Sequence, residues 1–397
     1  MVPKDLEPII LSEQVGVWAY VDHDSGSSVI VIKAAGTAAK SISKGADVKL
    51  YLGVAGSSTL FLGGGLKIYD IHDNPLLIPI FARTKSEVIG WRNIVNAKSF
   101  RVVVMDEFDA PVLRGTGYLN RVSHTLSKVL AIASWISNSQ ALAPFIEAIC
   151  NAIDPRYIRS SSMPAHVHDL ELQLELKQTL IISASESGTF QYDLNDMDEG
   201  TTQEKHLHQH LHLSFGDNVF LSPQIERGKK IRELTDVLVV SKESTLFFES
   251  KALCLNDSKD ESDYERRVGK VINHAKRAVG QLEGAVKNYR KTEYKVMNSM
   301  GIELPRSDSP NKTAIVVISE FVPHENWDSI LELIRHAYLK SDVRIVVIDL
   351  AELMRLLKIS SYSKRNLGFL LNQRFIASLE CDTLNIRSED SSLPFSI

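Results

Sequence analysis

Two acidic residues and a lysine lie close together around a predicted β-hairpin between residues 233 and 252. The segment ELTDVLVVSKESTLFFESKA contains two runs of β-branched and aromatic residues, separated by the polar tetrapeptide SKES. Such runs are typical of strands, and a short polar break is typical of a hairpin turn. A turn centred between Lys242 and Glu243 would place Asp236 opposite Glu249, since cross-strand partners keep a constant sum of residue numbers.

This register would bring three charged side chains onto one face of the hairpin. The Cβ atoms of Asp236 and Glu249 would lie ~5 Å apart. Lys251 would project from the same face, ~6.6 Å further along the strand. Two carboxylates this close repel each other unless a cation lies between them, and hard divalent ions prefer oxygen ligands. The hairpin therefore predicts a divalent-metal site beside an ammonium group. A loop of odd length would shift the register and separate the two acids.

These three residues resemble the signature of the PD-(D/E)XK nuclease superfamily, whose members have the restriction-endonuclease-like fold. In that signature an Asp on one strand is followed by Glu-x-Lys on the next, here Asp236, Glu249 and Lys251. Thr235 replaces the Pro that often precedes the first acid. The resemblance covers roughly residues 200 to 375 and implies a metal-dependent nuclease that uses Mg²⁺ or Mn²⁺.

The resemblance also implies a role for each of these residues. Asp236 and Glu249 would be metal ligands, together with the backbone carbonyl of Ser250. Lys251 would orient or help deprotonate the attacking water and stabilise charge on the phosphate. Burial near a metal would lower the pKa of Lys251 toward a useful value.

Further residues of the implied site come from the helices on either side of the hairpin. Family members often carry another acid on a preceding helix, and Glu204 is the corresponding residue here. Glu233 and Glu226 are alternatives for the same accessory ligand position. The glutamine of the following helix corresponds to Gln281, in the segment RAVGQLEGAVKNY.

The helix expected from Tyr264 to about Tyr294 is basic, although the protein has a net charge of −4. Residues 264–295 contain nine Lys or Arg and three Glu. These basic side chains either contact a phosphate backbone or form a solvated face that balances the preceding acidic loop. The residues expected to contact DNA are Arg232, Arg266, Arg267, Lys270 and Arg277.

Two further motifs could bind ligands but are better explained structurally. His206, His208, His210 and His212 form i,i+4 pairs on an expected helix, which is a usable zinc spacing. No third ligand lies nearby in the sequence, so a partly exposed helix face is favoured. Residues 63–65 (GGG) lack the Gly-Lys-Ser/Thr of a phosphate-binding loop, so a turn or bulge is expected there.

The composition is that of an ordinary globular protein with two or three domains. Its 397 residues are 44% hydrophobic and 24% charged, close to the average for such proteins. Cys150, Cys254 and Cys381 lack metal-ligand spacing and are expected to be reduced, buried thiols in the cytoplasm. We expect no signal peptide in MVPKDLEPII and no membrane-spanning segment.

The pattern of elements divides the chain into four parts. Residues 1–120 contain short β-type runs typical of a sandwich or barrel-like module. Residues 121–182 are expected to form a helical extension and an edge strand, in which alternate leucines from Leu170 to Leu176 face one side. Residues 183–203 are polar and acidic and are expected to be a linker. Residues 204–397 are expected to form the α/β nuclease-like domain, with a mixed sheet flanked by helices.

Together, the residues and the resemblance predict a Mg²⁺- or Mn²⁺-dependent deoxyribonuclease. By analogy it would be an endonuclease of a bacterial restriction or anti-phage defence system. Its partners would be DNA, a second copy in a homodimer, and a defence-system subunit bound through the N-terminal module, with no membrane. The alternative is a non-catalytic nucleic-acid- or partner-binding protein that retains the nuclease fold.

Overall fold

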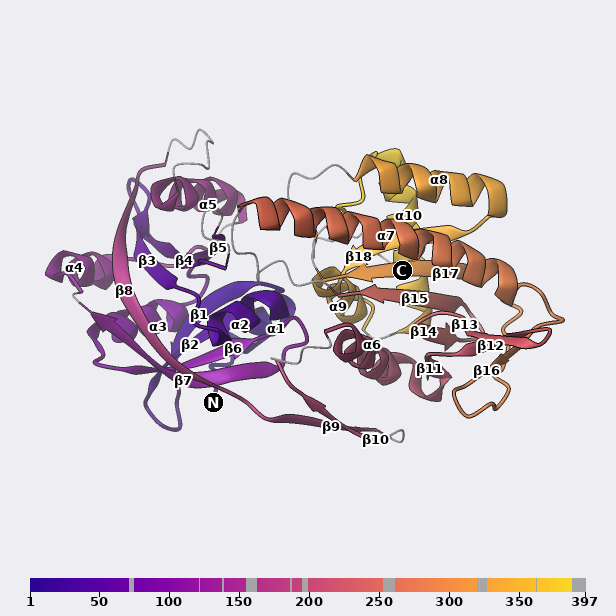
Figure 1. Ribbon diagram of the computed structural model, residues 1–397. Helices are drawn as coiled ribbons and strands as arrows, with labels where there is room; N and C mark the ends of the chain where they lie inside the picture. Colours follow the sequence, from indigo (N-terminus) through magenta and orange to yellow (C-terminus); the bar gives the residue numbers. More distant parts are fainter. Residues whose placement is uncertain are drawn as a thin grey trace. The chain divides into compact units, whose positions relative to one another are not determined.

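The computed structural model shows two compact units with mixed α/β structure (Figure 1). Unit 1 comprises Met1–Ser183 and Thr189–Asn195, and unit 2 comprises Ala184–Gly188 and Asp196–Ile397. The structure describes residues 1–70, 75–120, 122–137, 139–154, 163–185, 188–194, 199–252, 261–319, 321, 327–361 and 363–387. Within these ranges, no helix combines the length and the apolar character needed to cross a membrane.

One eight-stranded mixed sheet is the framework of unit 1. Its strands are β1 Gly16–Val21, β2 Ser28–Lys33, β3 Val48–Ala55, β4 Phe61–Ile68, β5 Leu76–Phe81, β6 Phe100–Met105, β7 Pro111–Asn120 and β8 Ala165–Gln178. The strand order is β1-β2-β6-β7-β8-β3-β4-β5, and only the β2–β6 pair is parallel. The sheet curls until its edge strands β1 and β5 approach each other. This arrangement agrees with the barrel-like alternative for the β-rich module.

Strand β8 lies in the interior of the sheet, so the expectation of an edge strand is wrong. Its first half pairs with β3 and its second half with β7. The predicted alternation is confirmed: Leu170 is buried, and Leu172, Leu174 and Leu176 pack against the same core. Because β8 is hydrogen-bonded on both sides, this part of residues 121–182 belongs to the eight-stranded sheet.

The helices of unit 1 are α1 Glu7–Ser12, α2 Gly36–Ser43, α3 Lys85–Asn96, α4 His124–Ile132 and α5 Ser139–Ile153. Helix α5 explains why residues 63–65 form neither a turn nor a bulge. All three glycines lie within β4 in regular register with β3 and β5. A Cβ atom added to Gly63 would lie 2.3 Å from Cζ of Phe145 on α5. Gly63 and Gly65 therefore let the helix pack directly on the strand, whereas a Cβ on Gly64 would meet the backbone of β3.

The first turn of α3 holds a carboxylate that is fully buried. Thr84 and Glu87 form a capping box, in which each side chain accepts a hydrogen bond from the backbone of the other residue. Glu87 also accepts a hydrogen bond from the backbone N–H of Arg83 at 2.8 Å. Burial disfavours the charged form and raises the pKa of Glu87 to about 7, against an ordinary value near 4.5.

We expect Glu87→Gln to change how the stability of unit 1 depends on pH. Between about pH 4.5 and 7 the unfolded chain loses a proton that folded Glu87 retains, so the native protein loses stability as pH rises. Glutamine cannot ionise, and its side-chain oxygen can still accept both backbone hydrogen bonds. Denaturant titrations should therefore show the variant gaining roughly 1–3 kcal/mol relative to the native protein across this window, and no more above it. A constant difference at every pH would contradict this cause.

Residues 183–203, expected to be a linker, contain regular structure. Strands β9 Ile181–Ser185 and β10 Gly188–Tyr192 pair with each other, and helix α6 begins at Glu199. Leu194 is buried in the core of unit 1 and Tyr192 packs against it. These two apolar side chains in a polar segment are the physical reason for the difference.

A five-stranded mixed sheet forms the centre of unit 2. Its strands, in order across the sheet, are β11 Val219–Leu221, β14 Val237–Val240, β15 Thr245–Lys251, β17 Lys312–Ile318 and β18 Arg344–Asp349. A smaller three-stranded sheet contains β13 Lys230–Glu233, β12 Gln224–Arg227 and β16 Lys295–Met297. The pairs β15–β17 and β17–β18 are parallel, and β14 is antiparallel to β15.

Helices cover both faces of this sheet, as expected for an α/β domain. They are α6 Glu199–Phe215, α7 Glu261–Tyr289, α8 Asp328–Ser341, α9 Leu350–Ile359 and α10 Lys364–Glu380. Helices α7 and α8 lie on one side, and α6 and α9 lie on the other (Figure 1). Phe247 marks the first face, because its ring packs edge-on against Tyr289 of α7 at 5.2 Å. Strands β17 and β18 are parallel and joined through α8. Helix α7, expected to reach about Tyr294, ends at Tyr289, and the chain then forms β16.

The cysteines agree only in part with their expected burial. Cys150 is a buried free thiol, as predicted. Cys381 is exposed, because it follows the last residue of α10. Cys254 lies outside the described residues.

Candidate active site

The hairpin that carries the three charged residues has the predicted register. Val237 pairs with Phe248, and Val240 pairs with Thr245. These pairs keep the sum of residue numbers that places Asp236 opposite Glu249. Asp236 itself comes directly before β14, at the edge of the ladder. The turn and the cross-strand arrangement are therefore confirmed.

Lys251 contacts both Asp236 and Glu249. Nζ of Lys251 donates to Oε2 of Glu249 at 2.8 Å and lies 3.6 Å from Oδ2 of Asp236. The backbone N–H of Ser250 donates to the same Oδ2 atom at 2.7 Å. Thr235 holds the strand before Asp236 in place, because its hydroxyl donates to the carbonyl of Phe248 at 2.6 Å. Both carboxylates thus converge on one cation position, which the ammonium group of Lys251 occupies.

The two carboxylates are buried and held close to each other. Asp236 and Glu249 expose 9% and 4% of their surface. Burial, together with the charge of Asp236, raises the pKa of Glu249 to about 7. Burial also raises the pKa of Asp236, although Lys251 opposes that shift. Each acid is costly to ionise in this place, and a cation with more charge than a single ammonium would reduce that cost.

The two neighbouring acids raise the pKa of Lys251, whereas the sequence-based expectation concerned a lysine beside a bound metal ion. Burial by itself lowers it, but the charges of Glu249 and Asp236 outweigh burial, so the pKa is raised. Glu204 on α6 contributes in the same direction. Beside these two acids the ammonium form of Lys251 is favoured, and that form can donate hydrogen bonds and stabilise negative charge.

The donor set fits a hard divalent ion that retains water ligands. Mg²⁺ is commonly bound by one or two carboxylates together with waters and substrate phosphates. Asp236 and Glu249 supply two carboxylates, and the peptide of Ser250 is fixed beside Asp236. In the part of the chain that the structure describes, no three His, Cys, Asp or Glu side chains gather as a metal-binding group. The ion would therefore depend on backbone, water or substrate oxygens for its remaining ligands.

Two of the three candidates for the accessory metal ligand, Glu204 and Glu233, lie near the site. Glu204 is half-buried on α6 and close enough to influence Lys251. Glu233 at the end of β13 is exposed, and its charge raises the pKa of Glu249. Glu226 on β12 does not line the cleft at this site.

A cleft of about 290 Å³ opens beside the two acids. Helix α7, the small sheet and the start of the hairpin form its walls. The lining includes five predicted site residues, Asp236, Glu249, Gln281, Arg232 and the accessory-ligand candidate Glu233. Gln281 is thus brought to the site although it lies 32 residues after Glu249.

Several residues on the α7 wall of this cleft were not predicted from the sequence. They include Gly280, Gly284 and Asn288, which are spaced four residues apart, and Ala285; Tyr294 follows beyond the helix. A Cβ atom added to Gly280 or Gly284 would meet nothing within 4 Å. Spacing of i,i+4 places the three α7 residues on one helix face. This i,i+4 spacing beside Gln281 was the feature of the sequence from which these residues could have been predicted to line the site.

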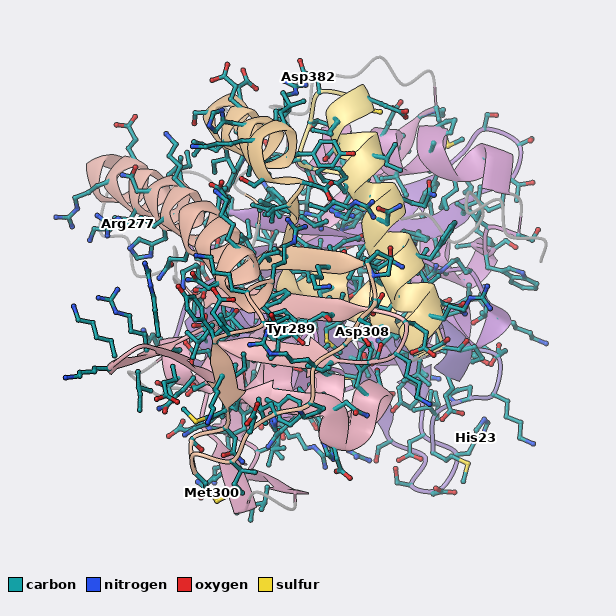
Figure 2. All side chains as sticks on the ribbon, turned by 90° about the vertical axis from the view of Figure 1, so that its right-hand side faces the viewer. His23, Arg277, Tyr289, Met300, Asp308 and Asp382 are labelled. Atoms are coloured by element: carbon teal, nitrogen blue, oxygen red, sulfur yellow. The ribbon has the colours of Figure 1, made fainter. Side chains whose placement is uncertain are left out.

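The basic face of α7 lies near the same site. Arg266, Lys270 and Arg277 are exposed, while the side chain of Arg267 lies outside the described residues. Burial lowers the pKa of His274, and so do the charges of Arg277, Lys251 and Lys270. His274 is therefore within electrostatic reach of both Lys251 and the basic face. Figure 2 shows Arg277 on the outer side of α7, whereas Tyr289 of the same helix points toward the sheet.

The histidines of α6 form no metal centre with three such ligands among the described residues. His208 and His212 stack with ring centroids 6.3 Å apart and are half-buried, in agreement with a partly exposed face. His206 differs from the expectation because it is buried. Burial, with a smaller effect of His210, lowers its pKa to about 3, so His206 is a neutral core residue.

Comparison of the chain with protein-family models gives no match, and neither does comparison with the curated proteins.

Proposed function

We propose that this protein is a Mg²⁺- or Mn²⁺-dependent nuclease that hydrolyses phosphodiester bonds, with DNA as its substrate. The observation that carries the proposal is the convergence of Asp236, Glu249 and Lys251 at the edge of one hairpin. Nothing in the packing of a hairpin requires two buried acids and a lysine in contact, since burying such charges costs free energy. A site that binds a metal ion and a phosphate would use all three, the acids as metal ligands and the lysine as a phosphate donor.

Each of these residues has a distinct task in the proposed reaction. Asp236 and Glu249 would hold the divalent ion, with the carbonyl of Ser250 as an additional ligand. The bound ion would supply a Lewis acid for the phosphate and lower the pKa of a water molecule. Lys251, protonated and held by both acids, would donate to the phosphate oxygens and stabilise the charge that develops there. Gln281, on the wall of the cleft, would orient the attacking water or the substrate.

The surroundings of the cleft support a polyanionic substrate. Arg232 lines the cleft, and Lys270 and Arg277 act electrostatically on the same region. Phosphate contacts of this kind provide affinity without sequence specificity. A role in bacterial restriction or anti-phage defence, cytoplasmic location, a homodimer and a defence-system partner stay predictions that rest on the resemblance alone.

The direct test uses purified full-length protein and supercoiled plasmid DNA. We expect nicked or linear plasmid with Mg²⁺ or Mn²⁺ and intact plasmid with EDTA. Linear duplex DNA, single-stranded DNA and RNA would define the substrate form. Inactivity on all four substrates with both metals would contradict the proposal, and retained DNA binding would then favour the non-catalytic alternative.

Neutralising the basic face of α7 should weaken DNA binding at every sequence alike. For Lys270→Gln combined with Arg277→Gln, the slope of log Kd against log salt concentration should fall by about two, roughly one for each lost phosphate contact. Fluorescence anisotropy with two unrelated duplexes measures both quantities. Lys242→Gln, an exposed lysine in the hairpin turn, is the control with no expected effect. An unchanged slope in the double variant would identify the basic face as merely solvated.

A further inference from the structure

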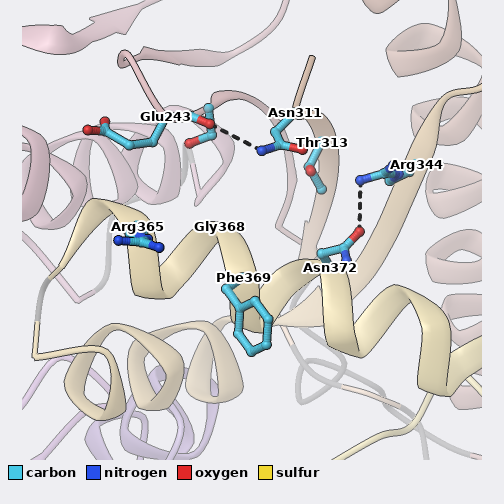
Figure 3. A pocket seen from close by; sticks show the side chains of 9 residues that line it. Glu243, Asn311, Thr313, Arg344, Arg365, Gly368, Phe369 and Asn372 are labelled. Atoms are coloured by element: carbon cyan, nitrogen blue, oxygen red, sulfur yellow. Dashed lines mark hydrogen bonds between the residues drawn. The ribbon is translucent and has the colours of Figure 1, made fainter. Parts of the chain in front are cut away.

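A second cavity, of about 410 Å³, lies in unit 2 away from the candidate active site. It is formed by the amino ends of β17 and β18, the turn before β15, and one face of α10 (Figure 3). Its lining residues are Glu243, Ser244, Asn311, Thr313, Arg344, Arg365, Gly368, Phe369 and Asn372. This volume lies within the range of about 300–1,000 Å³ that is typical of small-molecule sites.

Strand β15 separates this cavity from the catalytic residues. The cavity lies at the Thr245 end of β15, whereas Glu249 and Lys251 lie at the other end. Strands rise by about 3.3 Å per residue, so Ser244 and Lys251 are about 23 Å apart along the chain. A ligand in this cavity would therefore not compete with a substrate at the candidate active site.

Two guanidinium groups give the cavity its charge. Arg344 donates to Oδ1 of Asn372 at 2.9 Å, and Arg365 is exposed. Neither arginine forms an ion pair with a residue that the structure describes, and Glu243 forms none either. Thr313 and Asn372 add a hydroxyl and an amide beside Arg344 (Figure 3). The Arg344 end of the cavity is thus rich in hydrogen-bond donors and suited to an anion.

Gly368 and Phe369 also line the cavity, from the same helix as Arg365. Arg365, Gly368, Phe369 and Asn372 lie on one face of α10, as their spacing of three, four and seven residues requires. Phe369 leaves 46% of its surface exposed, which is unusual for a large apolar side chain in a polar cavity. A Cβ atom added to Gly368 would make only ordinary contact with Ser244, at 3.5 Å from its hydroxyl. Glycine costs about 1 kcal/mol relative to alanine within a helix, and here it keeps the cavity open.

We propose that this cavity binds a nucleoside monophosphate. The phosphate would lie at Arg344, Thr313 and Asn372, because a phosphate monoester is an anion that charge-assisted donors bind well. The base would stack on Phe369, and Arg365 and Glu243 would contact its polar edge or the ribose. Arg365 and Asn372 are seven residues apart on α10, about 10 Å along the axis, a span that one nucleotide can bridge.

Calorimetric titration of the full-length protein in EDTA tests this site independently of any cleavage. AMP and GMP are the nucleotide probes, and adenosine and inorganic phosphate represent the two halves of the ligand. We expect saturable binding of at least one nucleotide with a Kd below about 1 mM, and at least tenfold weaker binding of each half. Equal affinity for phosphate and nucleotide would overturn the proposal, and so would the absence of nucleotide binding.

Variants locate the binding at this cavity. Arg365→Ala and Phe369→Ala should each weaken binding about tenfold, the typical effect of losing a charged donor or a stacked ring. Gly368→Leu should abolish it by filling the cavity. Gly269→Leu on α7, where an added Cβ meets nothing within 4 Å, and Lys295→Ala on β16 are the matched controls and should bind normally.

Two results with these variants would overturn the assignment. The first is unchanged affinity in both Gly368→Leu and Arg365→Ala, with thermal unfolding showing that each variant is folded. The second is displacement of AMP by a single-stranded oligonucleotide at far lower concentration, which would identify the cavity as a nucleic-acid contact and not a nucleotide site.

Discussion

Lys251→Ala should lower metal-dependent cleavage of plasmid DNA by about two orders of magnitude or more, the usual effect of removing a principal charge-stabilising group. Asp236→Asn and Glu249→Gln should cause losses of similar size, because each removes a charged ligand while keeping the side-chain shape. The carboxylate variants lose activity because they bind the metal more weakly, whereas Lys251→Ala loses a charge-stabilising group. The dependence of the rate on metal concentration can distinguish these two causes. Excess Mn²⁺ should partly restore cleavage in the carboxylate variants but not in Lys251→Ala. Initial rates measured at increasing metal concentration provide the comparison.

Two controls accompany this experiment: DNA binding by the same variants, and removal of a lysine charge outside the site. DNA affinity in EDTA should be preserved in all three variants, since the basic face of α7 is unchanged. Lys242→Ala removes the same charge at the far end of the hairpin and should cleave normally. Native cleavage rates in both Lys251→Ala and Asp236→Asn would show that these residues are not the active site.

Gly284→Leu is expected to separate stability from activity. The cleft beside Asp236 and Glu249 is open at this position, because an added Cβ meets nothing within 4 Å. Leucine should stabilise α7 by about 0.5–1 kcal/mol, since glycine is a poor helix former. The same side chain would occupy part of a cleft of about 290 Å³, so cleavage should fall at least tenfold. Denaturant unfolding and plasmid cleavage, measured on one preparation, test both statements.

Gly269→Leu is the matched control for this substitution. Gly269 also lies on α7 with open space around it, but it does not line the cleft. It should gain similar stability and retain full activity. Equal activity in the two variants would mean that the cleft is not the path of the substrate.

The hairpin could be predicted because the features that determine it lie close together in the sequence. The turn length, the β-branched runs and the alternation of faces all lie within 20 consecutive residues, and the pairing of Val237 with Phe248 follows from them. Gln281, which lines the cleft, was singled out only through the family resemblance. Asn288 and Tyr294 were missed, because their position in the cleft depends on how β12 and β16 pair, which no local pattern specifies.

The errors in unit 1 have the same origin. Whether a strand is an edge or interior strand depends on distant partners, so the alternating leucines of β8 identified a strand but not its two neighbours. The glycines of β4 were expected to form a turn or bulge because no neighbouring residue shows what packs against this strand. The ring that does so at Gly63 belongs to Phe145, some 80 residues later. Tyr192 and Leu194 were hidden in a polar segment, although both pack into the core. One or two apolar residues in a polar segment do not by themselves predict burial, because the surface against which they pack comes from distant parts of the chain.

The position of β8 has a consequence for the order in which the chain is synthesised. Strands β3 to β5 can pair soon after they leave the ribosome, and so can β6 and β7, because these partners are neighbours in sequence. The two halves of the sheet can join only when β8, which begins at Ala165, has emerged. Translation proceeds at ~5–20 residues per second, so the edges of β3 and β7 stay unpaired for several seconds. An unpaired strand edge can pair with a strand of another chain. Yield of the native protein should therefore depend on how quickly the ribosome translates the codons between β7 and β8.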